Sequence, residues 1–243
     1  MKTFAAILTL TNAALCTGAL AAGCWSLAFE NVPFTACEVD PAEEEVRLFL
    51  KDADGRPFGS FDNVAAHVGT RDRDLVLAMN GGMYHPNRDP VGLYVEDGLE
   101  LAPVVTGDGP GNFGLLPNGV LCLDESTADI VESLSFVRSG ASCSFATQSG
   151  PLLVIDGQIH PRFLADSPSR FIRNGIGVTE DGRIVAAISD QPVNFHRFAR
   201  LFRDVFETPD ALFLDGKVSR LYAPMIGRHD FGLPMGPILG VVR

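Results

Sequence analysis

The sequence predicts an α+β fold: a mostly antiparallel sheet built from hairpins, with a few packed helices, in a single domain. Two observations predict it. Short apolar runs bounded by turn residues recur along most of the chain, and only a few segments repeat apolar residues at helical spacing. With 243 residues, of which 46% are hydrophobic and 20% charged, the chain is long enough to bury one large core. No linker, repeat or charged tail divides it into separate units.

The expected strands are short apolar runs of four to six residues. They lie at 45–50, 75–79, 92–95, 113–116, 120–123, 152–155, 175–178, 184–188 and 211–214. Pairs of Asp or Asn with Gly tolerate positive φ and therefore indicate hairpin turns. Such pairs are Asp54-Gly55, Asp97-Gly98, Asn118-Gly119, Asp156-Gly157 and Asp181-Gly182.

Three segments predict helices. A short one covers 60–68, and a third covers 126–137 with Ser126 as its N-cap. The strongest covers 194–207, where Asn194 is the expected N-cap. One face of this helix is aromatic and apolar, which predicts that it packs on the core through Phe195, Phe198, Ala199, Phe202 and Phe206.

The first 22 residues have the layout of a secretory signal peptide. Lys2 precedes an uncharged apolar run at 4–20, and small residues follow. The run is shorter than the roughly 20 apolar residues of a spanning helix, and no later segment is longer. We therefore expect a signal peptide at 1–22, a domain at 23–243, and a periplasmic or secreted protein without an integral membrane span. Lipid anchoring at Cys24 is less favoured, because Ala21 stands where lipoprotein signals usually carry Leu.

Four cysteines follow the expected signal peptide, and an even number in an exported chain favours disulfides. Four cysteines allow three pairings. Proximity in sequence favours Cys24–Cys37 and Cys122–Cys143. Free buried cysteines are the alternative. The formal charge of −11 argues against nucleic-acid binding but is compatible with a small anion held by a few arginines.

Polar residues follow several expected strands at their ends. Strand ends that gather at one sheet edge are a common way to build a polar pocket, and glycines let a ligand approach the backbone. The alternative is that these residues only form turns. The segments are Asn80-Gly81-Gly82, Gln148-Ser149-Gly150, Ser189-Asp190 and Asp215-Gly216.

Single charged residues add further candidates. Arg173 either pairs with a carboxylate, lies on an outer face or binds an anion. His196, near a helix start, is either structural or an acid–base group. Asp190 and Asp215 can ligate a hard cation. No compact ligand loop accompanies them, so a divalent cation stays open and no other cofactor is expected.

Four segments, in order, resemble the phosphodiester glycosidase family. They are 80–84, with Asn-Gly-Gly before an aromatic residue; 149–157, with Ser-Gly-Pro before a strand and turn; 173–177, with Arg before an apolar-glycine strand; and 214–219, with Leu-Asp-Gly and a later Ser. Met83 replaces a family aromatic residue and Lys217 replaces a family glycine. The resemblance covers about residues 45–242.

This resemblance implies an exported hydrolase that cleaves a sugar–phosphate phosphodiester at the anomeric carbon of an envelope or extracellular glycan. A phosphorylated sugar or glycan is then the expected partner. In this reading Arg173 binds the phosphate, Asp215 activates water or stabilises the sugar cation, Asp190 is the second choice for that role, and His196 is an acid–base group. The expected substrate-binding residues are Asn80, Gly81, Gly82, Gln148, Ser149, Gly150, Gly216 and Ser219.

Two other functions stay open at this point. One is a non-catalytic envelope module that binds phosphorylated polysaccharide, and the other is a phosphodiesterase that attacks phosphorus. The stereochemical outcome at the anomeric carbon and the oligomeric state are likewise open.

Overall fold

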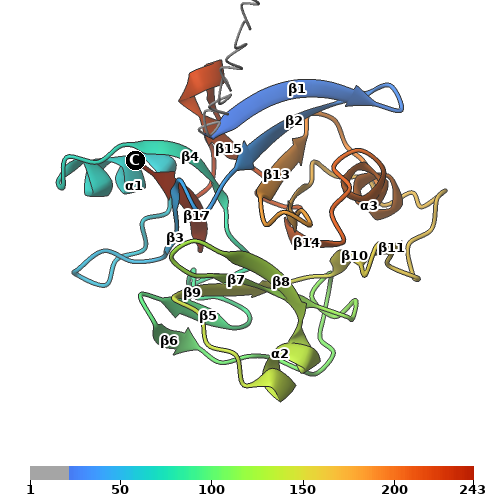
Figure 1. The fold of residues 1–243 in the computed structure, drawn as a ribbon, viewed down its shortest axis with the longest axis horizontal. Coiled ribbons are helices and arrows are strands. Elements are labelled where there is room, and N and C mark those ends of the chain that lie inside the picture. Colours follow the sequence, from blue (N-terminus) through green and yellow to red (C-terminus); the bar gives the residue numbers. More distant parts are fainter. Residues whose placement is uncertain (1–21) are drawn as a thin grey trace, which may run out of the picture.

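A computed structural model describes residues 22–243, so the expected signal peptide, apart from its last residue, lies outside the described residues. Three antiparallel sheets surround a shared core, and helices flank them (Figure 1). The helices are α1 (Phe61–Gly69), α2 (Ser133–Ser139) and α3 (Phe195–Asp204), with a 3₁₀ turn η1 (Pro224–Ile226). The α+β prediction is confirmed. No helix among residues 22–243 is long and apolar enough to cross a membrane.

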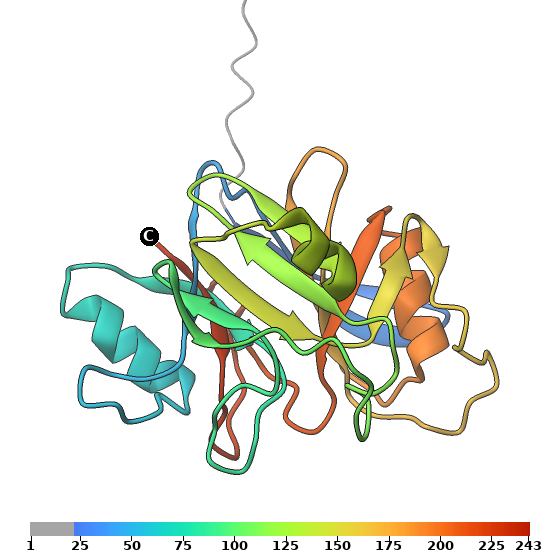
Figure 2. The same ribbon diagram turned by 90° about the horizontal axis from the view of Figure 1, so that it is seen from below.

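The largest sheet has the strand order β1-β2-β13-β12-β14-β10-β11. Its strands are β1 (Gly23–Phe29), β2 (Val32–Val39), β10 (Leu152–Ile155), β11 (Gln158–Ile159), β12 (Asn174–Val178), β13 (Ile184–Ser189) and β14 (Asp210–Asp215). Helix α3 packs on this sheet against β10 and β11 (Figure 2).

The two other sheets have five strands each. One has the order β16-β15-β4-β17-β3, formed by β3 (Glu45–Phe49), β4 (Leu75–Asn80), β15 (Leu221–Ala223), β16 (Arg228–His229) and β17 (Ile238–Val242). The other has the order β6-β5-β9-β7-β8, formed by β5 (Tyr94–Glu96), β6 (Leu99–Ala102), β7 (Gly119–Leu123), β8 (Ala128–Glu132) and β9 (Phe145–Ser149).

The core lies where the inner faces of the three sheets meet. Buried side chains from each sheet form one cluster, which includes Leu48, Met79, Leu121 and Leu212. A second cluster holds the aromatic face of α3, where Phe198 stacks on Phe34 with ring centroids 6.4 Å apart. Burial of these apolar surfaces is the main force that holds the sheets together. It also fixes the ends of β4, β9, β12 and β14 relative to one another.

Side chains cap α1 and α3, and the expected Asn194 cap is confirmed. Ser60 accepts a hydrogen bond from the backbone N–H of Asn63 at 3.2 Å, and Asn194 accepts one from Arg197 at 2.9 Å. These contacts satisfy backbone donors that have no partner in the first helical turn. Helix α3 ends at Asp204, earlier than expected.

The expected helix at 126–137 is wrong in its first half. Ala128 and Ile130 are buried while Asp129 is exposed, so the segment alternates with the period of a strand and pairs with β7 as β8. Helix α2 begins only at Ser133, and the carboxylate of Glu132 caps it by accepting from two backbone N–H groups.

Two further local predictions are wrong. The run at 113–116 is a turn, closed by a 3.1 Å hydrogen bond from the Leu115 N–H to the Asn112 carbonyl. Asn118-Gly119 is not a hairpin turn, since Gly119 begins β7 and Asn118 is buried, with its Nδ2 donating to the Phe113 carbonyl at 2.8 Å.

The sequence reading missed the β1–β2 hairpin. Its turn is Glu30-Asn31, with φ of 49° and 62°, and Glu30 is not a typical residue for that conformation. Cys24 and Cys37 lie directly opposite each other in this hairpin and form a disulfide. Cys122 and Cys143 form the second. Both expected pairings are confirmed.

Candidate functional site

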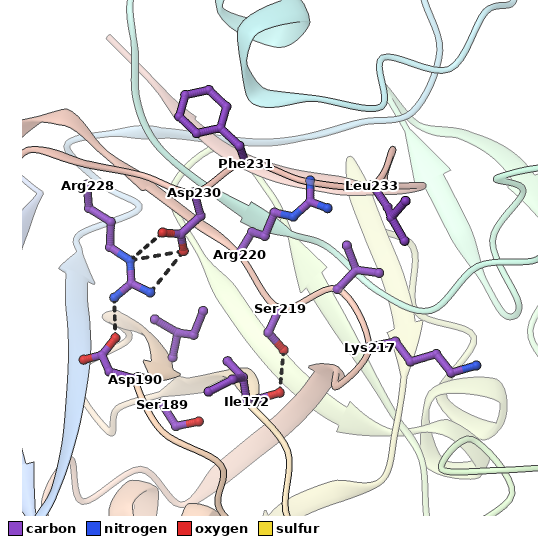
Figure 3. Close-up of a pocket in the computed structure, with 12 residues that line it drawn as sticks. Ile172, Ser189, Asp190, Lys217, Ser219, Arg220, Arg228, Asp230, Phe231 and Leu233 are labelled. Carbon is purple, nitrogen blue, oxygen red and sulfur yellow. Dashed lines mark hydrogen bonds and ion pairs between the residues drawn. The ribbon is translucent and has the colours of Figure 1, made fainter.

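Two adjoining cavities open where strand ends from the three sheets meet. The larger, about 900 Å³, is mostly apolar and contains Asp215; we name it the Asp215 cavity. The smaller, about 460 Å³, is polar; we name it the Arg220 cavity (Figure 3). Lys217, Val218 and Leu233 line both cavities and so form their common wall. Both volumes fall within the range of small-molecule sites.

A buried amide pair fixes the loop that carries this wall. The Nδ2 of Asn80 donates to the Oδ1 of Asn174 at 3.1 Å, and both side chains are fully buried. The same Oδ1 accepts from the Asp215 N–H at 3.1 Å, and the Ser219 Oγ lies 3.3 Å from it. The Oδ1 of Asn80 accepts from the Arg220 N–H at 3.0 Å. These bonds tie the ends of β4 and β12 to the segment after β14.

Asp215 is the carboxylate that faces the larger cavity. It lies at the end of β14 and is 9% exposed. Its Oδ1 accepts from the Lys217 N–H at 2.8 Å, and the N–H groups of Gly216 and Val218 also point at the carboxylate. Burial raises the pKa of Asp215 although these donors oppose the shift. A carboxyl with a raised pKa in a cavity is suited to proton transfer.

Arg173 lies behind the floor of the same cavity. It is 1% exposed, and its guanidinium stacks 3.6 Å from the Phe195 ring centroid. Its Nε donates to the Val193 carbonyl at 2.9 Å, whereas its Nη1 has no hydrogen-bond partner within the described chain. That Nη1 lies 3.6 Å from where a Cβ on Gly216 would stand.

No carboxylate among residues 22–243 forms an ion pair with Arg173. Burial lowers its pKa to about 10, so the guanidinium stays charged at neutral pH. The sequence left open that Arg173 pairs with a carboxylate or lies on an outer face. Within residues 22–243 the structure shows neither arrangement. Its positive charge acts on the cavity through Gly216, which lines it.

Asp190 lies in the other cavity, and the structure does not bring it together with Asp215. Its Oδ1 pairs with the Arg228 Nη1 at 2.6 Å, and its Oδ2 accepts from the Thr35 Oγ1 at 3.3 Å. In residues 22–243 no group of three or more His, Cys, Asp or Glu side chains is arranged to hold a metal ion.

Besides Asn80 and Arg173, three further polar candidates do not line either cavity. His196 lies half-buried in the first turn of α3. The amide of Gln148 is satisfied by the protein: its Oε1 accepts from the Leu93 and Val105 N–H groups, and its Nε2 donates to the Val105 carbonyl and the Ser133 Oγ. Ser149 is fully buried and donates to the Leu214 carbonyl at 3.0 Å.

Most of the candidate glycines serve packing. A Cβ on Gly81 would lie 2.9 Å from the Leu239 nitrogen, one on Gly82 2.7 Å from the Thr147 Oγ1, and one on Gly150 only 1.9 Å from the Asn118 Oδ1. Gly216 differs, since it lines the Asp215 cavity.

Sequence reasoning missed three residues of this region. Tyr84 lines the Asp215 cavity, and burial together with the nearby Asp215 charge raises its pKa. The Arg88 guanidinium lies 5.3 Å from the Tyr84 ring centroid. Arg220 lines the smaller cavity. Tyr84 belongs to the 80–84 segment and could have been found there, whereas Arg220 carries no local sequence signal. The segment 87–89, which contains Arg88, suggests an ion-paired loop as readily as a ligand contact.

Solved structures with low sequence identity share the fold. The catalytic domain of zebrafish N-acetylglucosamine-1-phosphodiester alpha-N-acetylglucosaminidase, auto-inhibited by its pro-peptide, matches with a TM-score of 0.62 at 15% identity, over 93% of this chain and 84% of that one. A hypothetical protein from Synechocystis matches with a TM-score of 0.57 at 13% identity, over 91% and 61%. A putative exported protein from Burkholderia pseudomallei matches with a TM-score of 0.51 at 12% identity, over 86% and 74%.

Sequence comparison identifies a relative with higher sequence identity. The uncharacterized protein YigE of Escherichia coli is 32% identical over 204 residues, which are 84% of this chain and 80% of YigE. The profile of the phosphodiester glycosidase family matches residues 73–231, a range that contains Arg173, Asn174, Asp215 and Arg220. The chain therefore belongs to the phosphodiester glycosidase family.

Proposed function

We propose that this chain is an exported hydrolase that cleaves a sugar–phosphate phosphodiester at the anomeric carbon, and that the reaction takes place in the Asp215 cavity. Family membership supports the reaction class. The observation that carries the proposal is one buried carboxylate with a raised pKa in a large, mostly apolar cavity. Two disulfides and the likeness to an exported protein support export, and an envelope or extracellular glycan is then the substrate.

Asp215 supplies the acid–base chemistry in this proposal. A water oxygen bonds to the anomeric carbon as the bond from that carbon to the phosphate oxygen breaks, and the electron pair leaves with the phosphate. Asp215 accepts the water proton and stabilises the positive charge that develops on the sugar. Asp190 is less suited to this role because Arg228 already holds its carboxylate in an ion pair.

The positive groups near Asp215 favour the phosphate. Arg88 and Lys217 balance Asp108 and Asp215 along the cavity lining, and Arg173 behind Gly216 adds an uncompensated positive charge. A surrounding of low polarity strengthens such attraction. Because a phosphate monoester is a good leaving group, the site needs no strong general acid for this bond. His196, which lies outside both cavities, has no role in this proposal.

Hydrolysis in water enriched in heavy oxygen tests the proposal. The purified chain is incubated with an α-N-acetylglucosaminyl phosphodiester, and the products are analysed by mass spectrometry. Attack at the anomeric carbon places the label in the sugar. Label in the phosphate would assign the attack to phosphorus. Absence of turnover of any sugar phosphodiester by a folded sample would favour a binding module instead.

A further inference from the structure

Arg220 presents a buried positive charge without a partner. The residue is 8% exposed, and its side chain lines the Arg220 cavity. Its backbone N–H is bound by Asn80, but its guanidinium donates to no acceptor and pairs with no carboxylate among residues 22–243. Figure 3 shows it between Asp230 and Leu233 with no interaction drawn to it. This is the second guanidinium near the cavities with unused donors.

Asp230 attracts this guanidinium but forms its ion pair with Arg228 instead. Arg228 takes both acidic groups of this cavity, with its Nη1 2.6 Å from Asp190 and its Nη2 3.0 Å from Asp230 (Figure 3). Asp230 also accepts from the Leu221 N–H at 2.9 Å. Lys217 adds a further positive charge on the common wall. The cavity lining thus carries one positive charge in excess, in a chain whose formal charge is −11.

The fold makes room for this guanidinium. Gly232, with φ of 149°, has no side chain on the face that Arg220 crosses, and a Cβ there would lie 2.5 Å from the Arg220 Nη2. The backbone of Arg220 is fixed by Asn80, so the side chain leaves from a rigid position. A planar, multi-donor group held in this way is suited to bind an oxyanion through two parallel hydrogen bonds.

A buried guanidinium that makes no hydrogen bond destabilises the fold, and the attraction of Asp230 offsets its desolvation only in part. A ligand anion would supply the missing charge. We propose that the Arg220 cavity is an anion subsite that binds a tetrahedral phosphate group through Arg220, with Lys217 at its border with the Asp215 cavity. Ser219 does not share in it as a donor, because its hydroxyl already donates to the Asp215 carbonyl at 2.7 Å.

The position of this subsite bears on the substrate class, and that step rests on the proposed function. The two cavities share a wall, so one extended ligand can occupy both. A substrate with its scissile phosphodiester in the Asp215 cavity then places a second phosphate at Arg220. The favoured substrate is therefore a glycan with more than one phosphate group rather than a simple sugar phosphodiester.

Phosphate titration tests the subsite without catalysis. Inorganic phosphate is added to the purified protein, and the arginine Nε–Hε signals are followed by NMR. The Arg220 signal is assigned by its absence in the spectrum of R220Q. The Arg220 signal is expected to shift on titration, and R220Q is expected to bind phosphate at least about tenfold more weakly. R220K keeps the positive charge but not the planar guanidinium, so its phosphate affinity is expected to fall less than that of R220Q. The matched control is R71Q, which removes an exposed arginine and leaves the affinity unchanged.

An unmoved Arg220 signal, or equal phosphate affinity in wild type and R220Q, overturns the subsite. R220Q should melt no lower than wild type, because it removes a buried charge whose desolvation outweighs its attraction to Asp230. If R220Q does not fold, R220K decides the same question by its affinity. The substrate step has its own readout. The ratio of kcat/KM for a two-phosphate glycan to that for a one-phosphate sugar should fall about tenfold in R220Q, and an unchanged ratio contradicts it. Absence of turnover with every substrate would contradict the proposed function. The phosphate titration would still decide whether the subsite exists.

Discussion

Replacing Asp215 with Asn should lower kcat by about 10²–10⁴-fold, the usual contribution of a positioned acid–base group. The amide keeps the shape of the carboxyl and can still accept from the Lys217 N–H, so the loop should hold its conformation. The variant is assayed on the α-N-acetylglucosaminyl phosphodiester beside D166N, which removes an exposed carboxylate that lines neither cavity and leaves the rate unchanged. Retained turnover in D215N would remove Asp215 from the chemistry.

The D215N variant should gain stability relative to wild type although it loses activity, and the gain should depend on pH. Burial raises the pKa of Asp215 in the folded state above its unfolded value. The wild-type carboxyl therefore favours folding while it is protonated at low pH, and this contribution is lost as the pH rises through the folded pKa. D215N does not titrate. Its melting temperature relative to wild type should thus rise from acid toward neutral pH, and a constant difference would show that the carboxyl is not destabilised by burial.

Replacing Asn174 with Ala should destabilise the fold by about 3 kcal/mol, because buried donors lose their acceptor at roughly 1–3 kcal/mol each. The Oδ1 of Asn174 accepts from the Asn80 Nδ2 and the Asp215 N–H, and the residue is fully buried. Denaturant unfolding measures this loss. N87A, at an exposed position, is the control and should change stability by no more than about 0.5 kcal/mol.

Activity should fall in N174A even well below its melting temperature. The amide holds the Asp215 N–H, so its loss displaces the carboxylate from the position that the chemistry needs. We expect kcat to fall by about 10²-fold, with a smaller change in KM. Full activity in a folded but destabilised variant would show that the amide pair serves stability alone.

Local sequence signals predicted the elements whose pattern is self-contained. The apolar run of β13 and the aromatic face of α3 each have the period of their element, and Asn194 caps the helix as its side chain suggests. Prediction failed where a long-range contact decides the structure. The β8 segment reads as helix until its pairing with β7 is known. Strand β1 was missed although most of its residues are apolar, because the Glu30-Asn31 turn that follows it is not a typical hairpin pair.

The candidate site shows the same difference between residues with a local sequence signal and residues that long-range contacts determine. Asp215 was identified because it ends an apolar strand, a position that the sequence displays. Gln148 and Gly150 stand in equally suggestive positions, yet packing partners distant in sequence occupy them: Val105 takes the Gln148 amide, and Asn118 fills the space beside Gly150. Arg220 was missed for the converse reason, since only the folded chain shows that its charge is buried and unpaired.

A structure of the D215N variant with an uncleaved α-N-acetylglucosaminyl phosphodiester tests the central claim most directly. The account predicts that the sugar occupies the Asp215 cavity, with its anomeric carbon beside the substituted side chain and its phosphate toward Lys217 and Arg88. A sugar bound only in the Arg220 cavity, or with its anomeric carbon remote from position 215, would contradict it.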